Sequence, residues 1–337
     1  MKDYKEFVEI FERVGHPPFR ARQLLNDVFN RGVADFREMK NLPVSLRDFL
    51  DEKVPLLSIE EKKVSVTPDG SVKKVLFGCQ KDGKKIESVL MRFKDGRRTV
   101  CVSSQVGCNV KCKFCATGQM GFKRNLTYEE IADQVLYFIL DLKDYSEPIT
   151  NVVFMGMGEP FNNYEEVMRA VRHLNDARAF NVGARNITLS TSGIVPGILS
   201  LIEEDLQVGL AVSLHAPLQD LREELVPIAK KYPLTDLMEA TQKYIRETHR
   251  RVTYEYVMLA GVNDKPVLAH ELGKLLKGQL CHVNLIPYNA TDTIYRCSRK
   301  KAIEDFKEIL ETYRVPVTVR VSLGQGIDAA CGQLANG

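Results

Sequence analysis

Beyond Thr99 the sequence alternates between short runs of β-forming residues and longer stretches in which apolar residues recur at helical spacing. Strands that alternate with helices in this way are typical of a parallel sheet whose strands are joined by helices. The runs that predict strands are TNVVFMGM, NITLSTSG, VGLAVSLH, VTYEYVML and CHVNLIPYN. The pattern therefore predicts an α/β fold over residues 99–337, either a partial barrel or an open sheet.

Two further segments precede this α/β region. Residues 1–55 show helical apolar spacing at Phe7, Ile10 and Phe11, which predicts a small helical accessory domain. In residues 56–98, Asp-Gly pairs separate runs of β-forming residues, and Asp-Gly is a strong signal for a hairpin turn. The three pairs are Asp69-Gly70, Asp82-Gly83 and Asp95-Gly96. We therefore expect an antiparallel hairpin segment between the helices and the α/β region.

A helix is expected to begin after Thr127, because Thr127 and Glu130 have the spacing of a capping box. The apolar residues that follow recur on one helical face. They are Ile131, Val135, Phe138 and Leu142. A cysteine-rich loop comes just before this helix, so we expect that loop to lie between a strand and a helix.

Composition and charge narrow the class of protein. Hydrophobic residues make up 44% and charged residues 27% of the chain, and no stretch is apolar enough to span a bilayer. The start, MKDYKEFVEIFERVG, is charged and amphipathic, unlike a secretory signal. We therefore expect a cytoplasmic protein with no membrane partner. In that reducing compartment, eight cysteines favour metal or redox chemistry over a disulfide framework.

The net charge of +3 is small, but the charge is unevenly distributed. The segment from Lys62 to Arg98 holds 11 Lys and Arg against 4 Asp and Glu. This predicts a local basic surface, which is either a solvated sheet face or a surface that contacts phosphate groups. Composition leaves both readings open.

The stretch CNVKCKFC places Cys108, Cys112 and Cys115 in CxxxCxxC spacing. Three thiolates in one short loop can hold a [4Fe–4S] cluster while leaving one iron without a protein ligand. That iron can bind the amino and carboxylate groups of S-adenosylmethionine (SAM) and pass an electron to its sulfonium. A structural zinc site usually has four ligands, and no convincing fourth ligand lies nearby. The loop therefore predicts a radical-SAM enzyme.

Several long motifs occur in order along nearly the whole chain: CVSSQVGCNVKCKFCATGQMGFKRNLT, FMGMGEP, TLSTSG, SLHAP, YVMLAGVND, NLIPYN and IDAACGQL. They resemble the RlmN/Cfr family of radical-SAM ribosomal RNA (adenine) methyltransferases. The resemblance implies a partial (β/α)6 barrel with an N-terminal accessory domain, and an adenosine of 23S rRNA as the substrate. RlmN-type members methylate C2, and some also modify the adenosine next to the tRNA anticodon. Cfr-type members methylate C8, which confers antibiotic resistance.

The resemblance also implies a ping-pong mechanism that uses two SAM molecules. Cys331 takes a methyl group as an S-methylcysteine intermediate, and a deoxyadenosyl radical then abstracts hydrogen from it so that the methylene radical adds to adenine. Glu87 acts as the proton acceptor, and Cys101 releases the RNA through a transient disulfide with Cys331. The resemblance further implies an electron donor such as flavodoxin or ferredoxin, and we expect the enzyme to be a monomer. Without the resemblance, either thiol reads as a small buried hydrophobe.

The strand pattern singles out Glu87 independently. In IESVLMRF, alternation places Glu87 on the same side as Val89, Met91 and Phe93. A carboxylate that loses hydration on an apolar face becomes a better proton acceptor. The alternative is a solvated glutamate on an edge strand.

For SAM itself, the resemblance names contacts at the ends of the predicted strands. Gly158 and Glu159 meet the amino group, and Asn289 holds the adenine end. The ribose and carboxylate side is lined by Ser190 and by the run Ser213, Leu214 and His215. A histidine in an apolar strand is more often a satisfied core residue than a ligand, so His215 has both readings. The other cysteines, Cys79, Cys281 and Cys297, are read as packing or surface residues.

The stretch VRVSLGQGIDAACGQL departs from both branches of the family just before Cys331, which leaves C2 and C8 methylation open. The GEP of FMGMGEP and the GFKRNL run favour C2. Two other classes of function stay open: a radical-SAM enzyme acting on protein or a small molecule, and a non-catalytic iron–sulfur protein that binds RNA. Neither of these requires a methyl carrier or a resolving thiol.

Overall fold

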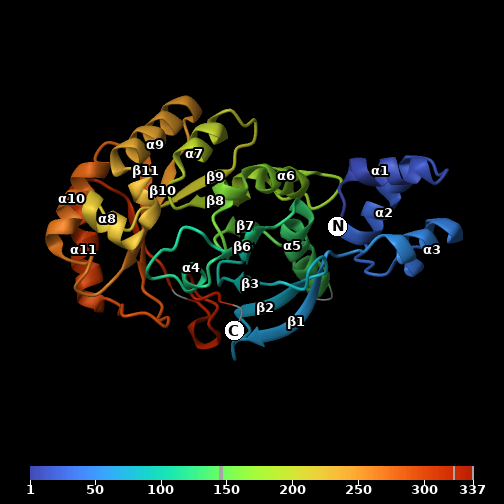
Figure 1. Ribbon diagram of the computed structural model, residues 1–337, viewed down its shortest axis with the longest axis horizontal. Coiled ribbons are helices and arrows are strands. Elements are labelled where there is room, and N and C mark those ends of the chain that lie inside the picture. The colour runs from blue at the N-terminus through green and yellow to red at the C-terminus, as the bar shows by residue number, and fades with distance from the viewer. Residues whose placement is uncertain (144–146, 322, 336–337) are drawn as a thin grey trace.

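The structure is a computed structural model that describes residues 1–143, 147–321 and 323–335 (Figure 1). One sheet of ten strands runs through the body of the protein. In spatial order its strands are β1 (Ile59–Val66), β2 (Val72–Cys79), β3 (Lys85–Arg92), β4 (Arg98–Cys101), β7 (Asn151–Phe154), β8 (Ile187–Thr191), β9 (Gly209–Ser213), β10 (Val252–Met258), β11 (Cys281–Pro287) and β12 (Val317–Val319). In this sheet the pairs from β4–β7 through to β11–β12 are parallel, whereas the pairs from β1–β2 to β3–β4 are antiparallel, so the α/β prediction is confirmed.

The helices and the short turns of 3-10 helix connect these strands. The α-helices are α1 (Tyr4–Arg13), α2 (Phe19–Phe29), α3 (Val44–Lys53), α4 (Ala116–Gln119), α5 (Tyr128–Leu142), α6 (Tyr164–Asn175), α7 (Val195–Ile202), α8 (Gln219–Leu225), α9 (Leu234–Thr248), α10 (Pro266–Leu276) and α11 (Lys300–Thr312). The 3-10 turns are Phe36–Glu38, Pro160–Asn163, Ala184–Asn186, Pro227–Lys230 and Gln325–Ile327. In Figure 1, α5 to α11 surround the curved sheet, and α1 to α3 form a lobe at its right.

The three Asp-Gly pairs lie at the hairpin turns, as predicted, between β1 and β2, β2 and β3, and β3 and β4. The antiparallel strands also continue directly into the parallel part. Cys101 at the end of β4 pairs with Val89 of β3 on one side and with Val153 of β7 on the other. Since β3 lies inside the sheet and Glu87 is fully buried, the interpretation of Glu87 as a solvated edge residue is wrong.

The capping box that predicted α5 is present, because Thr127 and Glu130 exchange side-chain and backbone hydrogen bonds. The four apolar residues of its predicted face are buried in the main core. The cysteine loop lies between a strand and a helix, as predicted, but that helix is the short α4 and not α5. The strand before the loop is β5 (Gln105–Gly107), and its partner β6 (Phe122–Asn125) lies between α4 and α5. Short polar strands of this kind carry little sequence signal.

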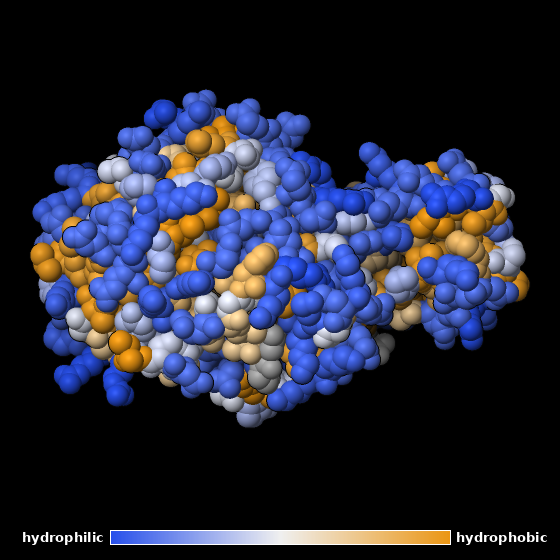
Figure 2. Space-filling view, in the orientation of Figure 1, coloured by the Kyte–Doolittle hydropathy of each residue, from blue (hydrophilic) through white to orange (hydrophobic). Residues whose placement is uncertain are grey.

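The N-terminal lobe docks on α5 and α6 through polar and aromatic contacts. Phe7 and Phe11 of α1 are fully buried. The Arg169 guanidinium of α6 lies 3.7 Å from the centre of the Tyr128 ring and forms an ion pair with Glu6. Hydrophilic residues cover most of the face shown in Figure 2. Among the described residues, no helix is both long enough and apolar enough to cross a membrane.

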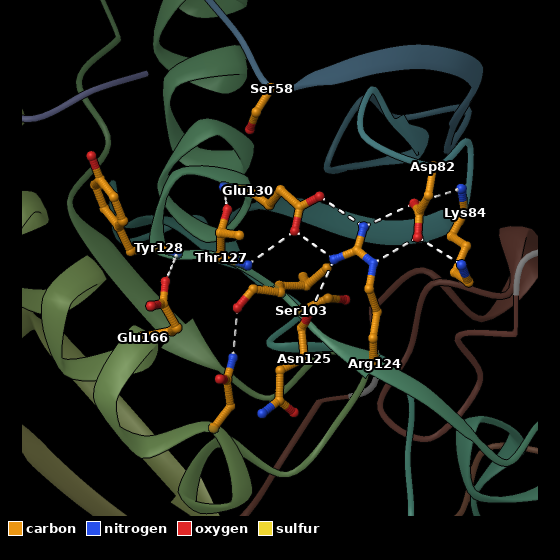
Figure 3. Close-up of polar contacts among 12 residues, drawn as sticks. Ser58, Asp82, Lys84, Ser103, Arg124, Asn125, Thr127, Tyr128, Glu130 and Glu166 are labelled. Atoms are coloured by element: carbon orange, nitrogen blue, oxygen red, sulfur yellow. Dashed lines mark hydrogen bonds and ion pairs between the residues drawn. The ribbon is translucent and has the colours of Figure 1, made fainter.

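Arg124 of β6 links the hairpin segment to α5 (Figure 3). Its guanidinium donates to Asp82, in the turn between β2 and β3, at 2.8 and 2.9 Å. It also donates to both carboxylate oxygens of Glu130 at 2.7 and 2.8 Å. The Glu130 side chain is only 3% exposed, so most of its hydration has been exchanged for these contacts and the helix cap.

We expect Arg124→Met to lower the free energy of unfolding by about 2 kcal/mol, because it leaves the buried Glu130 carboxylate without its cation. Urea denaturation would measure this change. The matched control is Arg97→Met, which removes an exposed ion pair with Asp95 and should leave the urea midpoint unchanged. Equal midpoints for both variants would contradict the linking role of Arg124.

Candidate active site

A cavity opens at the carboxyl ends of the parallel strands, the edge at which ligands bind in α/β proteins. It contains about 980 Å³ of space, part of it open to solvent. That size is in the upper range of small-molecule and cofactor sites, which is roughly 300–1,000 Å³. The strands contribute its wall through their last residues, among them Phe154, Thr191 and Ser213.

The three cysteines of the CxxxCxxC loop all line this cavity. Burial raises the pKa of the Cys108 thiol to about 12, and it raises the pKa of Cys112 and Cys115 as well. Iron would have to displace these protons, because thiolates are the ligands of a cluster. Among the described residues, no group of three or more His, Cys, Asp or Glu could hold a metal ion. A cuboidal cluster does not need three ligands around a single ion, because each of its cysteines binds a different iron.

Backbone contacts fix the course of the cysteine loop. Gly107 has a φ of +73°, and a Cβ atom there would lie 1.8 Å from the carbonyl oxygen of Gly121. On the opposite side, the Lys113 N–H donates to the Leu225 carbonyl of α8 at 3.0 Å. The loop is thus held between the β5–β6 hairpin and α8, with three thiols around the cavity. This donor set and cavity fit a [4Fe–4S] cluster.

Gly158 and Glu159 lie on the cavity wall after β7. Gly158 has a φ of +105°, and a Cβ atom there would lie 2.6 Å from the Cβ atom of Gln105, so glycine is required. The Glu159 carboxylate accepts hydrogen bonds from the N–H and hydroxyl of Ser192 at 2.6 and 2.7 Å, and from the Phe161 N–H at 3.0 Å. Burial raises the pKa of Glu159, and these hydrogen bonds oppose that effect.

Of the other predicted SAM contacts, Ser190, Ser213, His215 and Asn289 line the cavity. Leu214 does not, because its side chain is fully buried in the hydrophobic core, so only its backbone can serve a ligand.

His215 is both a buried residue and part of the cavity wall, so it fits both the core and the ligand-contact interpretation of the sequence. Its ring lines the cavity, yet it is buried, and burial lowers its pKa to about 3. The Nδ1 atom accepts the Val257 N–H at 3.1 Å, which leaves the proton of the neutral imidazole on Nε2. The ring edge meets Phe114 of the cysteine loop, with 4.8 Å between ring centroids. His215 is therefore a neutral hydrogen-bond donor beside the loop.

A second cavity lies next to the first, and Cys331 lines both. Cys101 lines the second cavity, together with Val89, Met91 and Phe93 of the apolar face that the sequence predicted. Both cysteines are free thiols. Loss of hydration at the thiol raises the pKa of Cys331, although the residue as a whole is exposed, and the positive charge of Arg320 opposes this increase. Burial raises the pKa of Cys101 to about 12, with a smaller effect from the nearby Cys331.

Hydrogen bonds on both sides of Cys331 hold the C-terminal segment, residues 328–335, in the mouth of the barrel. Lys74 of β2 forms an ion pair with Glu87 at 3.0 Å and donates to the Asp328 carbonyl at 3.2 Å. The Glu87 Oε2 atom accepts the Ala335 N–H at 2.8 Å. Further contacts are Ala116 N–H to the Gly332 carbonyl at 2.8 Å, the Thr117 hydroxyl to the Leu334 carbonyl at 2.6 Å, and the Asn289 amide to the Cys331 carbonyl at 3.1 Å.

Sequence reasoning missed several charged residues of this region. Glu255 and Arg320 line the first cavity and lie 3.5 Å apart, and burial raises the pKa of Glu255. Lys74 gave no signal, because its partners Glu87 and Asp328 are distant in sequence. Ser322, in the atypical stretch before Cys331, lies outside the described residues, as does Gly337.

Comparison with known proteins defines first the class of enzyme. A family model described as the Radical SAM superfamily matches residues 102–272, which include the cysteine loop and most of the parallel strands. A second model, the ribosomal RNA large subunit methyltransferase N-terminal domain, matches residues 2–56. The crystal structure of a radical SAM methyltransferase from Sphaerobacter thermophilus is 46% identical, with a TM-score of 0.97 over 100% of this chain and 98% of that one.

Curated relatives then narrow the class. The probable dual-specificity RNA methyltransferase RlmN of Symbiobacterium thermophilum is 46% identical over 98% of this chain and 89% of its own length. The ribosomal RNA large subunit methyltransferase N of Nitrosopumilus maritimus is 43% identical over 98% of this chain and 96% of its own length. The chain belongs to the RlmN family of radical-SAM RNA methyltransferases, which confirms the resemblance drawn from its motifs.

We expect Lys74→Met to loosen the C-terminal segment, because it removes both the ion pair with Glu87 and the contact with Asp328. The rate of Cys331 alkylation by iodoacetamide, followed by peptide mass spectrometry, should rise several-fold. The neighbouring Lys73→Met removes an ion pair with Asp141 instead and is the control. An alkylation rate that rises equally in both variants would show that Lys74 does not hold the segment.

Proposed function

We propose that this enzyme methylates C2 of an adenosine in 23S rRNA, with Cys108, Cys112 and Cys115 holding a [4Fe–4S] cluster. The observation that carries the proposal is the position of Cys331, which faces both the cavity of the cluster cysteines and the cavity of Cys101. Bound cluster and SAM supply the radical chemistry that a poorly nucleophilic aromatic carbon requires. Gly158, Glu159 and the polar side chains at the strand ends hold SAM.

Cys331 accepts the methyl group as a thiolate and presents it to the RNA base. Arg320, which shares the wall between the two cavities, favours that thiolate by its charge. Cys101 then attacks the carrier sulfur as a thiolate and breaks its bond to the methylene carbon. That carbon keeps the electron pair and gains a proton, so the methylated RNA leaves and a Cys101–Cys331 disulfide forms. The reduced thiol pool of the cytoplasm restores both cysteines.

Glu87 takes the proton that the target carbon must lose. Its neighbours Val89 and Met91 on the same face of β3 line the second cavity. Its Oε2 atom is covered by the Ala335 N–H, so the proposal requires the end of the C-terminal segment to move when RNA binds. Lys74 stays beside the carboxylate through this movement, because it belongs to β2.

The choice of C2 over C8 rests on the GEP and GFKRNL motifs and on the naming of the relatives. Several of these are called dual-specificity RNA methyltransferases, which supports tRNA as a second substrate of this chain. An RNA substrate and catalytic thiols that must be reduced favour a cytoplasmic location. A monomeric enzyme and a flavodoxin or ferredoxin as electron donor enter the proposal through the family resemblance alone.

The basic segment from Lys62 to Arg98 bears on RNA contact. Seven of its cations form ion pairs with carboxylates. Much of its positive charge is therefore neutralised locally. This favours the interpretation that those residues lie on a solvated face of the sheet. The exposed Lys81, Lys85 and Lys94 are the better candidates for phosphate contacts.

Anaerobic reaction of the reconstituted enzyme with methyl-labelled SAM and protein-free 23S rRNA tests the proposal. Mass spectrometry of the nucleosides should show labelled 2-methyladenosine. Labelled 8-methyladenosine would show that the enzyme methylates C8 and not C2. If an enzyme with an intact cluster yields no labelled nucleoside, the proposed function is wrong.

Under the same conditions we expect Cys101→Ala to trap an RNA–protein adduct through Cys331, because the resolving thiol is missing. The adduct should appear as a slow-migrating band that nuclease treatment removes. Cys297→Ala removes an exposed cysteine outside both cavities and should turn over without an adduct. If Cys101→Ala gives no adduct while its cluster is intact, the carrier mechanism is wrong.

A further inference from the structure

Arg222 of α8 is a fully buried cation that the proposed reaction does not use. Its side chain is 0% exposed. The Nη2 atom donates to the Ser192 carbonyl at 2.7 Å and to the Ser213 carbonyl at 3.3 Å. Within the described part of the chain, Nε and Nη1 are buried without any acceptor, and no carboxylate forms an ion pair with the guanidinium.

An isolated buried charge is strongly unfavourable, so a site of this kind calls for a counter-charge. Burial lowers the pKa of Arg222 to about 10, which leaves it charged at neutral pH. The loop that carries Cys108, Cys112 and Cys115 packs against α8, the helix of Arg222, and three metal-bound thiolates would supply negative charge there.

Packing places α8 directly against that loop. Leu225 of α8 accepts the Lys113 N–H at 3.0 Å, and its side chain shares an apolar cluster with Cys108 and Phe114. The two carbonyls that hold Nη2 belong to Ser192 and Ser213, which line the cavity. Arg222 thus lies behind the cavity wall and beside the loop, where bulk water does not screen its charge.

Gly193 shows how closely the wall approaches the guanidinium. A Cβ atom at Gly193 would lie 2.9 Å from Nη2, and its φ of +106° also favours glycine. The backbone after β8 therefore leaves just enough room for a buried arginine.

We propose that Arg222 supplies the counter-charge of the iron–sulfur cluster and raises its reduction potential. The inference rests on the proposed cluster. A [4Fe–4S]²⁺ core with three thiolates has a net charge of about −1, and one electron from the external donor takes it to about −2. A fixed cation nearby stabilises the second state more than the first, so reduction becomes more favourable. Arg222 acts through the cluster and touches no reacting atom.

The test is a redox titration of the reconstituted full chain, followed by electron paramagnetic resonance without SAM or RNA. At the wild-type midpoint, Arg222→Met should lower the ratio of reduced to oxidised cluster at least tenfold, a shift of about 59 mV for one electron. Arg222→Gln should shift it in the same direction, and Arg222→Lys should stay closer to wild type. Lys113→Met removes an exposed cation from the loop and should change the ratio much less, because solvent screens that charge.

A second measurement separates this role from a structural one. Without iron, Arg222→Met should be at least as stable to urea as the wild-type apoprotein, because a buried unpaired charge is replaced by an apolar side chain of similar length. A clear loss of apoprotein stability would instead assign Arg222 a structural role and overturn the proposal. So would an unchanged potential in Arg222→Met and Arg222→Gln with an intact cluster. Failure of the wild type to assemble any cluster would overturn the proposed function itself.

Discussion

The backbone pairing of β4 with its two neighbours is the constraint on which the active site depends. The strand is antiparallel to β3 and parallel to β7, so a hairpin meander and a parallel barrel share one sheet. This junction places Glu87 of β3 and Cys101 of β4 near the edge where the cysteine loop and the first cavity lie. A barrel without the meander would have the cluster cysteines but would lack the apolar face of β3 that lines the second cavity.

Local signals predicted the parts of the fold that local interactions determine. The Asp-Gly turns, the capping box at Thr127 and the strand runs depend on neighbouring residues, and all were confirmed. The cysteine loop was equally visible, because three cysteines at short spacing form a local pattern. Leu214 was harder to place, since adjacent strand residues face opposite sides and the motif did not say which side serves the ligand.

The residues that sequence reasoning missed owe their importance to contacts between distant segments. Arg222 stands in QDLREEL, where alternating charges indicate a solvated helix, and only the packing of α8 on the cysteine loop buries it. Lys74 sits in a basic strand and becomes significant through its pair with Glu87 and its bond to the C-terminal segment. Arg124 joins an early hairpin turn to the cap of α5. The residue pattern within one segment cannot predict partners that lie far away in the sequence.

The wall shared by the two cavities has a consequence for how two substrates can reach Cys331. Cys331 lines both cavities, which also share Asn289 and Arg320. Under the proposed function, SAM bound in the first cavity and an adenine base bound in the second would both lie next to this one sulfur atom without occupying the same space.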